Sequence, residues 1–293
     1  MGYTITLTNQ RGDVLAFDFD KRILREHDGL GMPPVILLTQ RGVTQDGSTF
    51  RDAYLDERRI SLTCDLIEDN EVDLWESRLE LSRFFASLQD ACYLDVVTPS
   101  AVSYRIDIRF AGELSLPRAP TDAPISQRVA LLLWAGETFY NVVMNVDTLV
   151  AGGGGAGLAI PLPVPFTVGA SALDTTALIA YDGTWKSYPL VRIAGPIEDP
   201  IVENETTGRT LDFTGATIAD GDYLVIDCAA KTVVDQDAAN QFALLTAASD
   251  IGEFYLAAHP EVTNGGNSIR ITGSSVGPNV RVIFSYHDRF IGV

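Results

Sequence analysis

Apolar and polar residues alternate one by one over much of the chain. Such alternation puts apolar side chains on one face of a β-strand, because successive residues of a strand point to opposite faces. The clearest apolar positions are Ile60, Leu62 and Cys64, then Tyr104, Ile106, Ile108 and Phe110, and finally Val280, Val282, Phe284 and Tyr286. These segments are predicted to be half-buried strands of antiparallel sheets, and the protein is predicted to be mainly β.

One segment, from about residue 70 to residue 89, has helical spacing instead. Its apolar residues are Leu74, Leu81, Phe84, Phe85 and Leu88. Asn70 is a suitable N-cap, and Glu71 and Asp73 lie where the positive end of the helix dipole favours carboxylates. The pattern predicts a single amphipathic helix that covers a sheet, rather than a cofactor or membrane segment.

The segment from about residue 22 to residue 58 is predicted to leave the compact part of the first domain. Within its first third, Gly29 and Gly31 are followed by the adjacent prolines Pro33 and Pro34. Adjacent prolines lack amide donors and are poorly suited to regular ladder pairing. We therefore expect an extended excursion, of the kind that can embrace a neighbouring molecule.

A stretch rich in Gly and Pro divides the chain. Residues 151–165 contain four consecutive glycines and three prolines, and they are predicted to form a linker. Residues 1–150 are the first predicted domain and residues 166–293 are the second. Turn sequences recur at short intervals in the second, among them Asp182-Gly183, Gly195-Pro196, Asp220-Gly221 and Gly277-Pro278. This spacing predicts a β-sandwich.

Charge and cysteine content narrow the function classes. The 293 residues contain 21 Lys and Arg against 39 Asp and Glu, a formal net charge of −18. Specific nucleic-acid binding is not expected, since that affinity depends largely on Lys and Arg contacts to phosphates. Three widely spaced cysteines give no disulfide framework and favour folding in a reducing cytoplasm. The chain begins on an alternating segment rather than a secretion signal, and no membrane insertion is expected because no apolar run reaches roughly 20 residues.

Three groups of short segments carry a resemblance to known proteins through their order and spacing. The first is Gly31–Pro34 with Thr39–Arg41, Gln45–Gly47 and Arg59–Leu62, and the second is Gly195–Ile197 with Pro200–Val202 and Asn204–Gly208. The third is Gly221–Asp227 with Lys231–Val233, Gly266–Ile269, Gly273-Ser274 and Val280–Val282. These segments resemble the siphovirus distal tail protein family, and the resemblance covers nearly the whole chain. The chain departs from the family in its longer glycine-rich linker.

The resemblance implies an N-terminal domain that forms a hexameric ring and a peripheral, galectin-like C-terminal β-sandwich. It implies a structural hub, not an enzyme, at the tail tip of a long-tailed phage or phage-like particle. Such a hub joins the tail tube to the receptor-binding apparatus and lets DNA pass. The implied partners are other copies of the chain, the tail-tube protein, a tail-tip hub protein and receptor-binding proteins. Assembly is expected in the cytoplasm of the bacterial host.

Candidate subunit contacts follow from the first group of segments and from its proline-rich excursion. They are Met32, Pro33, Pro34, Gln40 and Arg41. In the family, the corresponding part of the fold helps to lock neighbouring subunits together. We expect these residues to lie at the boundary between copies.

Carbohydrate binding is the main alternative. A galectin-like sandwich has shallow faces on which aromatic rings can stack against sugars. The candidate rings are Trp185, Tyr188, Tyr223, Phe254 and Tyr255. Aromatic residues of a sandwich more often belong to its core, so these candidates are weak.

No residue pattern predicts a catalytic residue, a cofactor or a metal site. The glycine run lacks the Lys and Ser or Thr of a phosphate-binding loop, and no Gly-x-Ser-x-Gly motif is present. His27, His259 and His287 are far apart in the sequence. Among 39 acidic residues, no one carboxylate pair singles out a glycosidase site.

The acidity also suggests a hypothesis about the ring. Carboxylates along a channel let DNA phosphates slide, whereas Lys and Arg retain them. The candidate channel residues are Asp65, Glu68, Asp69 and Asp107, and a channel lined by Arg22, Arg25, Arg58 or Arg59 would contradict the hypothesis. In that case the acidity contributes to solubility alone.

Overall fold

The computed structural model describes residues 4–17, 21–86, 90–112, 114–116, 125–150, 172–259 and 266–293. It divides into two compact units: unit 1, Met1–Val142 with Phe290–Val293, and unit 2, Val143–Arg289. The described residues form 21 strands and one α-helix, which confirms the prediction of a mainly β protein.

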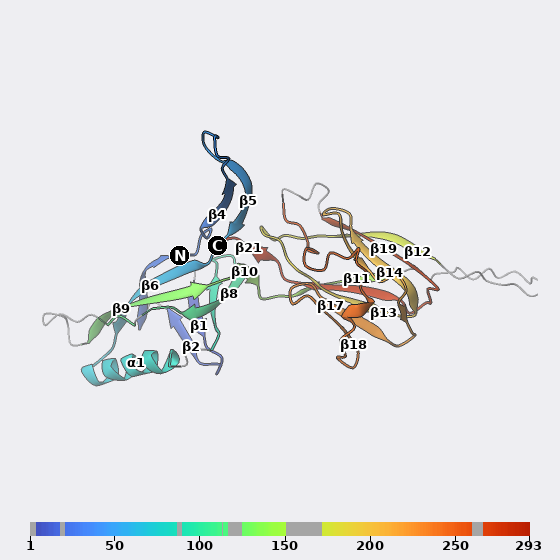
Figure 1. Ribbon diagram of the computed structural model, residues 1–293. Helices are drawn as coiled ribbons and strands as arrows, with labels where there is room; N and C mark the ends of the chain where they lie inside the picture. The colour runs from blue at the N-terminus through green and yellow to red at the C-terminus, as the bar shows by residue number, and fades with distance from the viewer. Residues whose placement is uncertain are drawn as a thin grey trace, which may run out of the picture. The chain divides into compact units, whose positions relative to one another are not determined.

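Unit 1 is built on a curled antiparallel sheet with the strand order β2-β1-β7-β8-β9-β6-β3 (Figure 1). These strands are β1 (Thr4–Thr8), β2 (Val14–Phe17), β3 (Arg22–Asp28), β6 (Arg58–Ile67), β7 (Cys92–Val97), β8 (Ser103–Phe110) and β9 (Ser126–Ala135). The short strand β10 (Phe139–Asn141) joins β8, and β21 (Arg289–Phe290) joins β10. β2 and β3, at the two ends of this order, contact each other, which shows that the sheet is curled.

The longest strand pair of unit 1 follows the predicted alternation. β6 and β9 pair in register over ten residues, from Arg58 opposite Ala135 to Ile67 opposite Ser126. The apolar residues Ile60, Leu62 and Cys64 of β6 are all fully buried. The sheet therefore has an inner apolar face that fills the core of the unit.

The helix α1 (Glu71–Phe84) begins as predicted and ends earlier. Asn70 caps it, since its side chain accepts a hydrogen bond from the Asp73 amide at 3.0 Å. The predicted end at residue 89 is wrong, because the last helical residue is Phe84. The ring of the next residue, Phe85, stacks on Phe110 of β8 with 4.7 Å between ring centroids, and the chain turns there. Leu88 lies outside the described residues.

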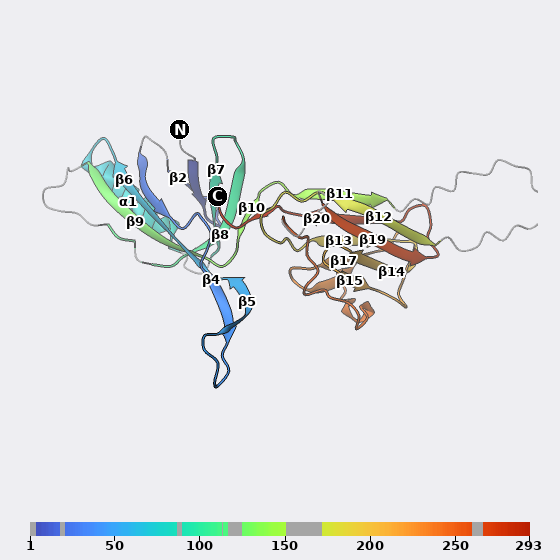
Figure 2. The same cartoon turned by 90° about the horizontal axis from the view of Figure 1, so that it is seen from above.

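A separate hairpin forms the predicted excursion, which is shorter than expected. The strands β4 (Val35–Gln40) and β5 (Thr49–Leu55) pair with each other and with no other described strand. In Figures 1 and 2 this hairpin extends away from the sheet of unit 1. The prediction that the excursion begins near residue 22 is wrong, because β3 pairs with β6 from Arg22 to Asp28, with one irregularity after Leu24.

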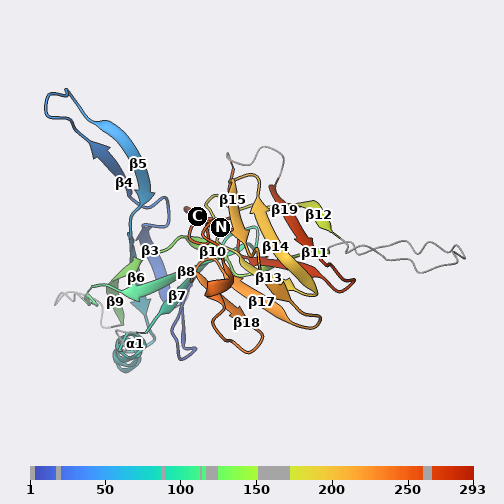
Figure 3. The ribbon, with the colours of Figure 1, turned by 45° about the vertical axis from the view of Figure 1, so that its right-hand side comes forward.

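Unit 2 is a sandwich of two antiparallel sheets (Figure 3). One has the order β11-β20-β13-β17-β18, from β11 (Asn145–Val150), β13 (Leu190–Ala194), β17 (Tyr223–Asp227), β18 (Thr232–Asp235) and β20 (Arg281–Tyr286). The other has the order β12-β19-β14-β15 with β16 beside β14, from β12 (Leu173–Ile179), β14 (Ile197–Asn204), β15 (Arg209–Asp212), β16 (Thr217–Ile218) and β19 (Asn267–Ser274). A 3₁₀ turn, η1 (Phe242–Leu244), follows β18. The buried rings of Phe213, Phe254 and Phe284 belong to the core.

The observed boundaries of the two units differ from the predicted ones at residues 150 and 166. β11 belongs to unit 2, because all six of its residues pair with β20. Residues 290–293 belong to unit 1, to which the chain returns after the sandwich. The predicted linker, residues 151–165, lies outside the described residues. Its position in the sequence is between β11 and β12, two strands of the same unit.

Candidate assembly interface

The β4–β5 hairpin exposes apolar side chains on both of its faces. Successive residues of a strand alternate between faces, and all of Val35, Ile36, Leu37 and Leu38 are apolar. Leu37 is 60% exposed, and Phe50 of β5 is 61% exposed. A two-stranded hairpin is marginally stable by itself in water, and contiguous exposed apolar surface marks an interaction site. The hairpin therefore has the properties of a surface that a partner covers.

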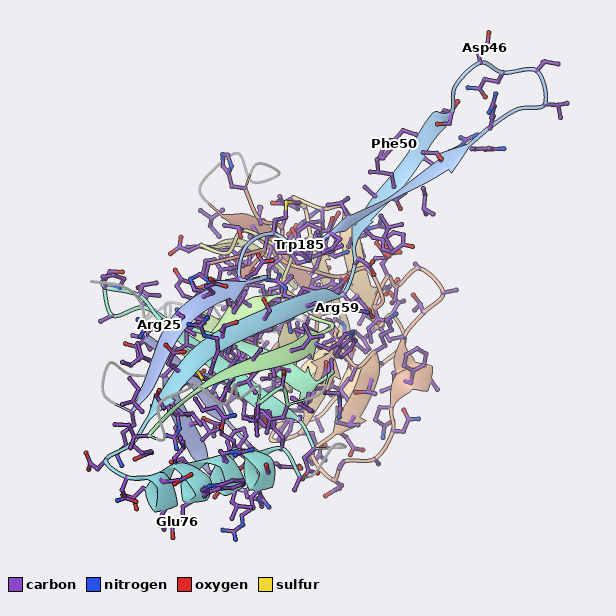
Figure 4. All side chains as sticks on the ribbon, turned by 90° about the vertical axis from the view of Figure 1, so that its left-hand side faces the viewer. Arg25, Asp46, Phe50, Arg59, Glu76 and Trp185 are labelled. Carbon is purple, nitrogen blue, oxygen red and sulfur yellow. The ribbon has the colours of Figure 1, made fainter. Side chains whose placement is uncertain are left out.

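Hydrogen bonds shape the far end of the hairpin. The Gln45 side chain accepts from the Gly42 amide at 3.1 Å and donates to the Thr49 hydroxyl at 2.8 Å. Across the two strands, Arg51 Nε donates to Gln40 Oε1 at 2.8 Å. Figure 4 shows Asp46 at this end of the hairpin and Phe50 along its strand. These bonds give the loop a defined shape.

A buried arginine holds the base of the hairpin. Arg58, the first residue of β6, is 2% exposed. Its guanidinium donates to the Gly31 carbonyl at 2.9 Å and to the Ile291 carbonyl, and it lies 4.9 Å from the centre of the Phe139 ring. Burial lowers the pKa of Arg58 to about 10. The side chain thus ties the hairpin base to the C-terminal residues of unit 1.

Close backbone packing at the same place requires glycine. Gly29 has a φ of +87°, and a Cβ there would lie 2.0 Å from the Arg59 carbonyl oxygen. A Cβ on Gly292 would lie 2.6 Å from the Gly31 backbone. The Val293 amide donates to the Leu30 carbonyl at 3.0 Å. The direction in which the hairpin leaves unit 1 is therefore fixed by packed backbone as well as by Arg58.

The predicted contact residues lie at the two ends of the hairpin. Met32, Pro34, Gln40 and Arg41 are exposed, whereas Pro33 is buried within the chain. At the base, the Pro34 carbonyl accepts from the Asp56 amide at 2.8 Å. Sequence reasoning missed the exposed apolar residues between these ends, which are Val35, Leu37, Leu38, Phe50 and Tyr54. Their signal was an unbroken apolar run followed by a turn, which is also typical of a core strand.

The acidic residues proposed for a channel are mostly paired within the chain. Asp65 accepts from Arg25 Nε at 2.7 Å and from Arg128 Nε at 3.1 Å. Burial alone would raise the pKa of the Asp65 carboxyl, but these two arginines outweigh it and lower the pKa. Asp107 accepts from the Tyr140 hydroxyl at 3.0 Å. Around Asp65 the surface combines one carboxylate with two arginines, so it is not an acidic wall.

Glu68 is paired as well. Lys21 Nζ lies 3.0 Å from Glu68 Oε2, and the Ser77 hydroxyl donates to the other carboxylate oxygen. Burial tends to raise the pKa of Glu68, yet the hydrogen bonds from Ser77 and Lys21 leave it below its ordinary value. Asp69 is exposed. Whether any of these residues faces a channel stays a prediction.

Three of the candidate glycan-binding rings surround a lysine. Lys186 Nζ lies 6.0 Å from the centre of the Trp185 ring, 5.6 Å from that of Tyr188 and 5.4 Å from that of Tyr255. The ammonium group thus lies near the three aromatic rings on which a sugar would stack. Phe254 is fully buried. Tyr223 has a different neighbour, Arg192, whose guanidinium carbon is 3.7 Å from its ring centre.

The described part of the chain holds no cluster of metal-ligand type. Within those residues, no three His, Cys, Asp or Glu side chains converge as metal ligands would. No helix described by the structure has the length and apolar character required to cross a membrane. Cys64, Cys92 and Cys228 are buried free thiols, and burial raises the pKa of Cys64 to about 11.

Known structures give a whole-length match to this fold. The Dit protein (gp 19.1) of SPP1, described as a paradigm of the hub adsorption apparatus in phages that infect Gram-positive bacteria, matches with a TM-score of 0.64. The match has 11% sequence identity and covers 97% of this chain and 98% of the Dit chain. Identity at this level establishes a shared fold and nothing finer.

More distant matches add no argument. A chain of the phage P2 baseplate in its activated conformation with Ca matches with a TM-score of 0.44 and 10% identity, over 95% of this chain and 99% of that one. No protein-family model matches the sequence, and no curated protein matches it. The resemblance seen in the sequence is therefore supported at the level of the fold alone.

Proposed function

We propose that this protein is a structural hub at the tail tip of a long-tailed phage or phage-like particle. In this role, unit 1 closes into a hexameric ring with other copies of the chain, and unit 2 is a peripheral galectin-like sandwich. The ring connects the tail tube to a tail-tip hub protein and to receptor-binding proteins, and DNA passes through it. The virion tail tip is the site of action, and assembly takes place in the cytoplasm of the bacterial host.

The β4–β5 hairpin is the observation that carries the proposal. Both of its faces carry large apolar side chains. When a neighbour covers them, association is favoured by roughly 25 cal/mol per Å² of apolar area buried. Each copy in a ring can offer its hairpin to the next copy and receive the hairpin of the previous one. Contacts of this head-to-tail kind close a ring when the rotation between copies is right. The fold shared with the SPP1 Dit protein supports the same role.

The proposal assigns the chain no catalytic role. A hub needs a defined position for its contact surfaces, which in this molecule the buried Arg58 and the packed backbone at Gly31 provide. Rigid placement of the hairpin lowers the conformational entropy lost when copies associate. The architecture at the hairpin base is therefore suited to assembly.

Self-association tests the proposal directly. The double variant Leu37→Ser with Phe50→Ser removes two exposed apolar side chains and touches no core residue. Multi-angle light scattering and negative-stain electron microscopy should show rings for the unmodified chain, with six times the 31.7 kDa mass of one copy. The double variant should shift the assembly midpoint to at least tenfold higher concentration, which corresponds to about 1.4 kcal/mol.

Leu178→Ser is the matched control. Leu178 is a similarly exposed apolar residue of β12 in unit 2, so its loss should leave the rings intact. If the unmodified chain stays a monomer at high concentration, alone and mixed with the tail-tube protein of the same particle, ring formation is contradicted. Rings that persist unchanged in the double variant would contradict the role of the hairpin.

A further inference from the structure

The outer face of the five-stranded sheet of unit 2 carries an uncommon combination of side chains. Its inner face, with Val191, Ile193 and Val282, is buried in the sandwich core. On the outer face, Arg192 of β13 lies opposite Ile283 of β20 on one side and Val225 of β17 on the other. Arg192 is thus flanked across the strands by two apolar residues, on the surface of a sheet whose strands appear side by side in Figure 3.

The nearest side chains along β13 continue this surface. Leu190 and Ala194 flank Arg192 two residues away on the same face, and Leu190 is exposed. Beyond Val225, the next strand contributes Val234. The outer face therefore has apolar side chains around Arg192, with Asp227 and Ser285 opposite Leu190 at one end.

A second arginine lies beside the first. Arg281 of β20 is opposite Ala194, which makes it a diagonal neighbour of Arg192 on the same face. Arg192, Arg281, Ala194, Asn279 and Ile283 line a surface hollow of about 250 Å³. None of these five lining residues is acidic. Just beyond the lining, the Asn279 amide donates to Asp220 at 3.1 Å.

The two arginine side chains retain unused donors. Within the described residues, neither forms an ion pair or a side-chain hydrogen bond, and Arg192 Nε is buried without an acceptor. The Tyr223 ring holds the Arg192 guanidinium by stacking, which leaves the N–H edge of the guanidinium for another group. By contrast, Arg270 on the other sheet has both Asp174 oxygens as partners at 2.9 Å.

We infer that this outer face is a docking surface for a partner protein, with an Asp or Glu side chain of the partner as its anchor. The carboxylate enters the hollow and accepts hydrogen bonds from Arg192 and Arg281, a geometry to which guanidinium groups are well matched. Apolar side chains of the partner cover Leu190, Val225 and Ile283. The site is in unit 2 and does not depend on ring formation by unit 1.

The surroundings favour a protein over a sugar as the occupant. Arginine and tyrosine within a desolvated apolar surface are the residues enriched at the energetic centres of protein interfaces. A sugar ring needs a free aromatic face, whereas the Tyr223 ring has the Arg192 guanidinium against it. The hollow of about 250 Å³ also suits one acidic side chain better than a chain of sugar rings.

Titration of the full-length chain tests the inference. The arginine Nε–H signals are followed by NMR while four probes are added separately: acetate, the peptide acetyl-Leu-Thr-Asp-Val-Leu-amide, inorganic phosphate and glucuronate. Acetate should shift the Arg192 signal saturably, and the peptide should bind at least tenfold more tightly than acetate. The same peptide with Asn in place of Asp should lose at least tenfold in affinity.

Variants separate the site from general charge effects. Arg192→Gln and Arg281→Gln should each weaken peptide binding at least tenfold, while Arg270→Gln should leave it unchanged. Circular dichroism checks that each variant folds, and Arg192→Lys replaces Arg192→Gln if the latter does not. Absence of a saturable shift with acetate and peptide overturns the inference, as does tighter binding of phosphate or glucuronate than of the peptide. Equal losses in Arg270→Gln would also overturn it.

Discussion

Two strand pairs of unit 1 have similar apolar content, but one is buried and the other is exposed. The β6–β9 pair lies within the curled sheet, where Leu62 is fully buried. The β4–β5 pair lies outside the sheet, where Leu37 is 60% exposed. β6 alternates apolar with polar residues, while β4 begins with four apolar residues in succession. The two strands differ in what their apolar residues face. In β6 they share one buried face, whereas in β4 they lie on both faces and are mostly exposed.

The contrast separates apolar residues that are buried within one copy from apolar residues that stay exposed. Inward apolar residues of β6 contribute to the stability of one copy, because folding alone removes them from water. Those of the hairpin contribute only when a second molecule covers them. Mutations in the two places should therefore separate stability from association.

The largest effect on stability is expected for Leu62→Ala. Loss of a fully buried leucine leaves a cavity and should lower the free energy of unfolding by about 2–5 kcal/mol. Leu37→Ala should change it by less than about 0.5 kcal/mol in dilute solution, because the side chain is already in water. Urea titration measures both, with hydrogen exchange of the β6 amides assigning the transition to unit 1. A comparable loss in the two variants would show that the hairpin is packed within one copy.

Arg58→Ala should have the next largest effect. It removes the guanidinium that donates to the Gly31 and Ile291 carbonyls. A cost of about 2–4 kcal/mol follows from the two lost hydrogen bonds and from the cavity left by a buried side chain. Arg59→Ala, at the exposed neighbouring position, should stay within about 0.5 kcal/mol. Hydrogen exchange should also show faster exchange of the Asp56 and Val293 amides in Arg58→Ala alone. Equal protection in both variants would mean that the hairpin base does not depend on Arg58.

The smallest effect concerns pH and the Glu68 pair. The folded pKa of Glu68 lies below its ordinary value of 4.5, so its contribution to stability is present above that pH and is lost as the pH falls through the folded pKa. Glu68→Gln should therefore flatten the decline in stability of unit 1 below pH 4.5, when compared by urea titration at several pH values. Asp69→Asn, at an exposed carboxyl, is the control and should leave the decline unchanged. An equally steep decline in Glu68→Gln would refute this coupling.

The sequence by itself determined the mainly β class, the strands around Leu62, Ile106 and Phe284, and the helix that begins after Asn70. Each of these depends on local periodicity or on capping chemistry, which adjacent residues specify. A resemblance in the order of short segments also anticipated the fold shared with the SPP1 Dit protein. The same local rules could not place the end of α1, because Phe85 leaves the helix to stack on Phe110, a residue distant in the sequence.

Tertiary structure alone decided which apolar strands are packed in the core and which are exposed. The run Val35–Leu38 resembles a core strand, and only the folded chain shows that Val35, Leu37 and Leu38 are exposed among the residues that the structure describes. Arg58 and Arg59 are adjacent arginines, yet the pleat of β6 buries one and exposes the other. The meeting of Arg192 with Arg281 likewise depends on strand pairing between distant segments. Burial and convergence are properties of long-range contacts, and local sequence patterns do not encode which distant segments will meet.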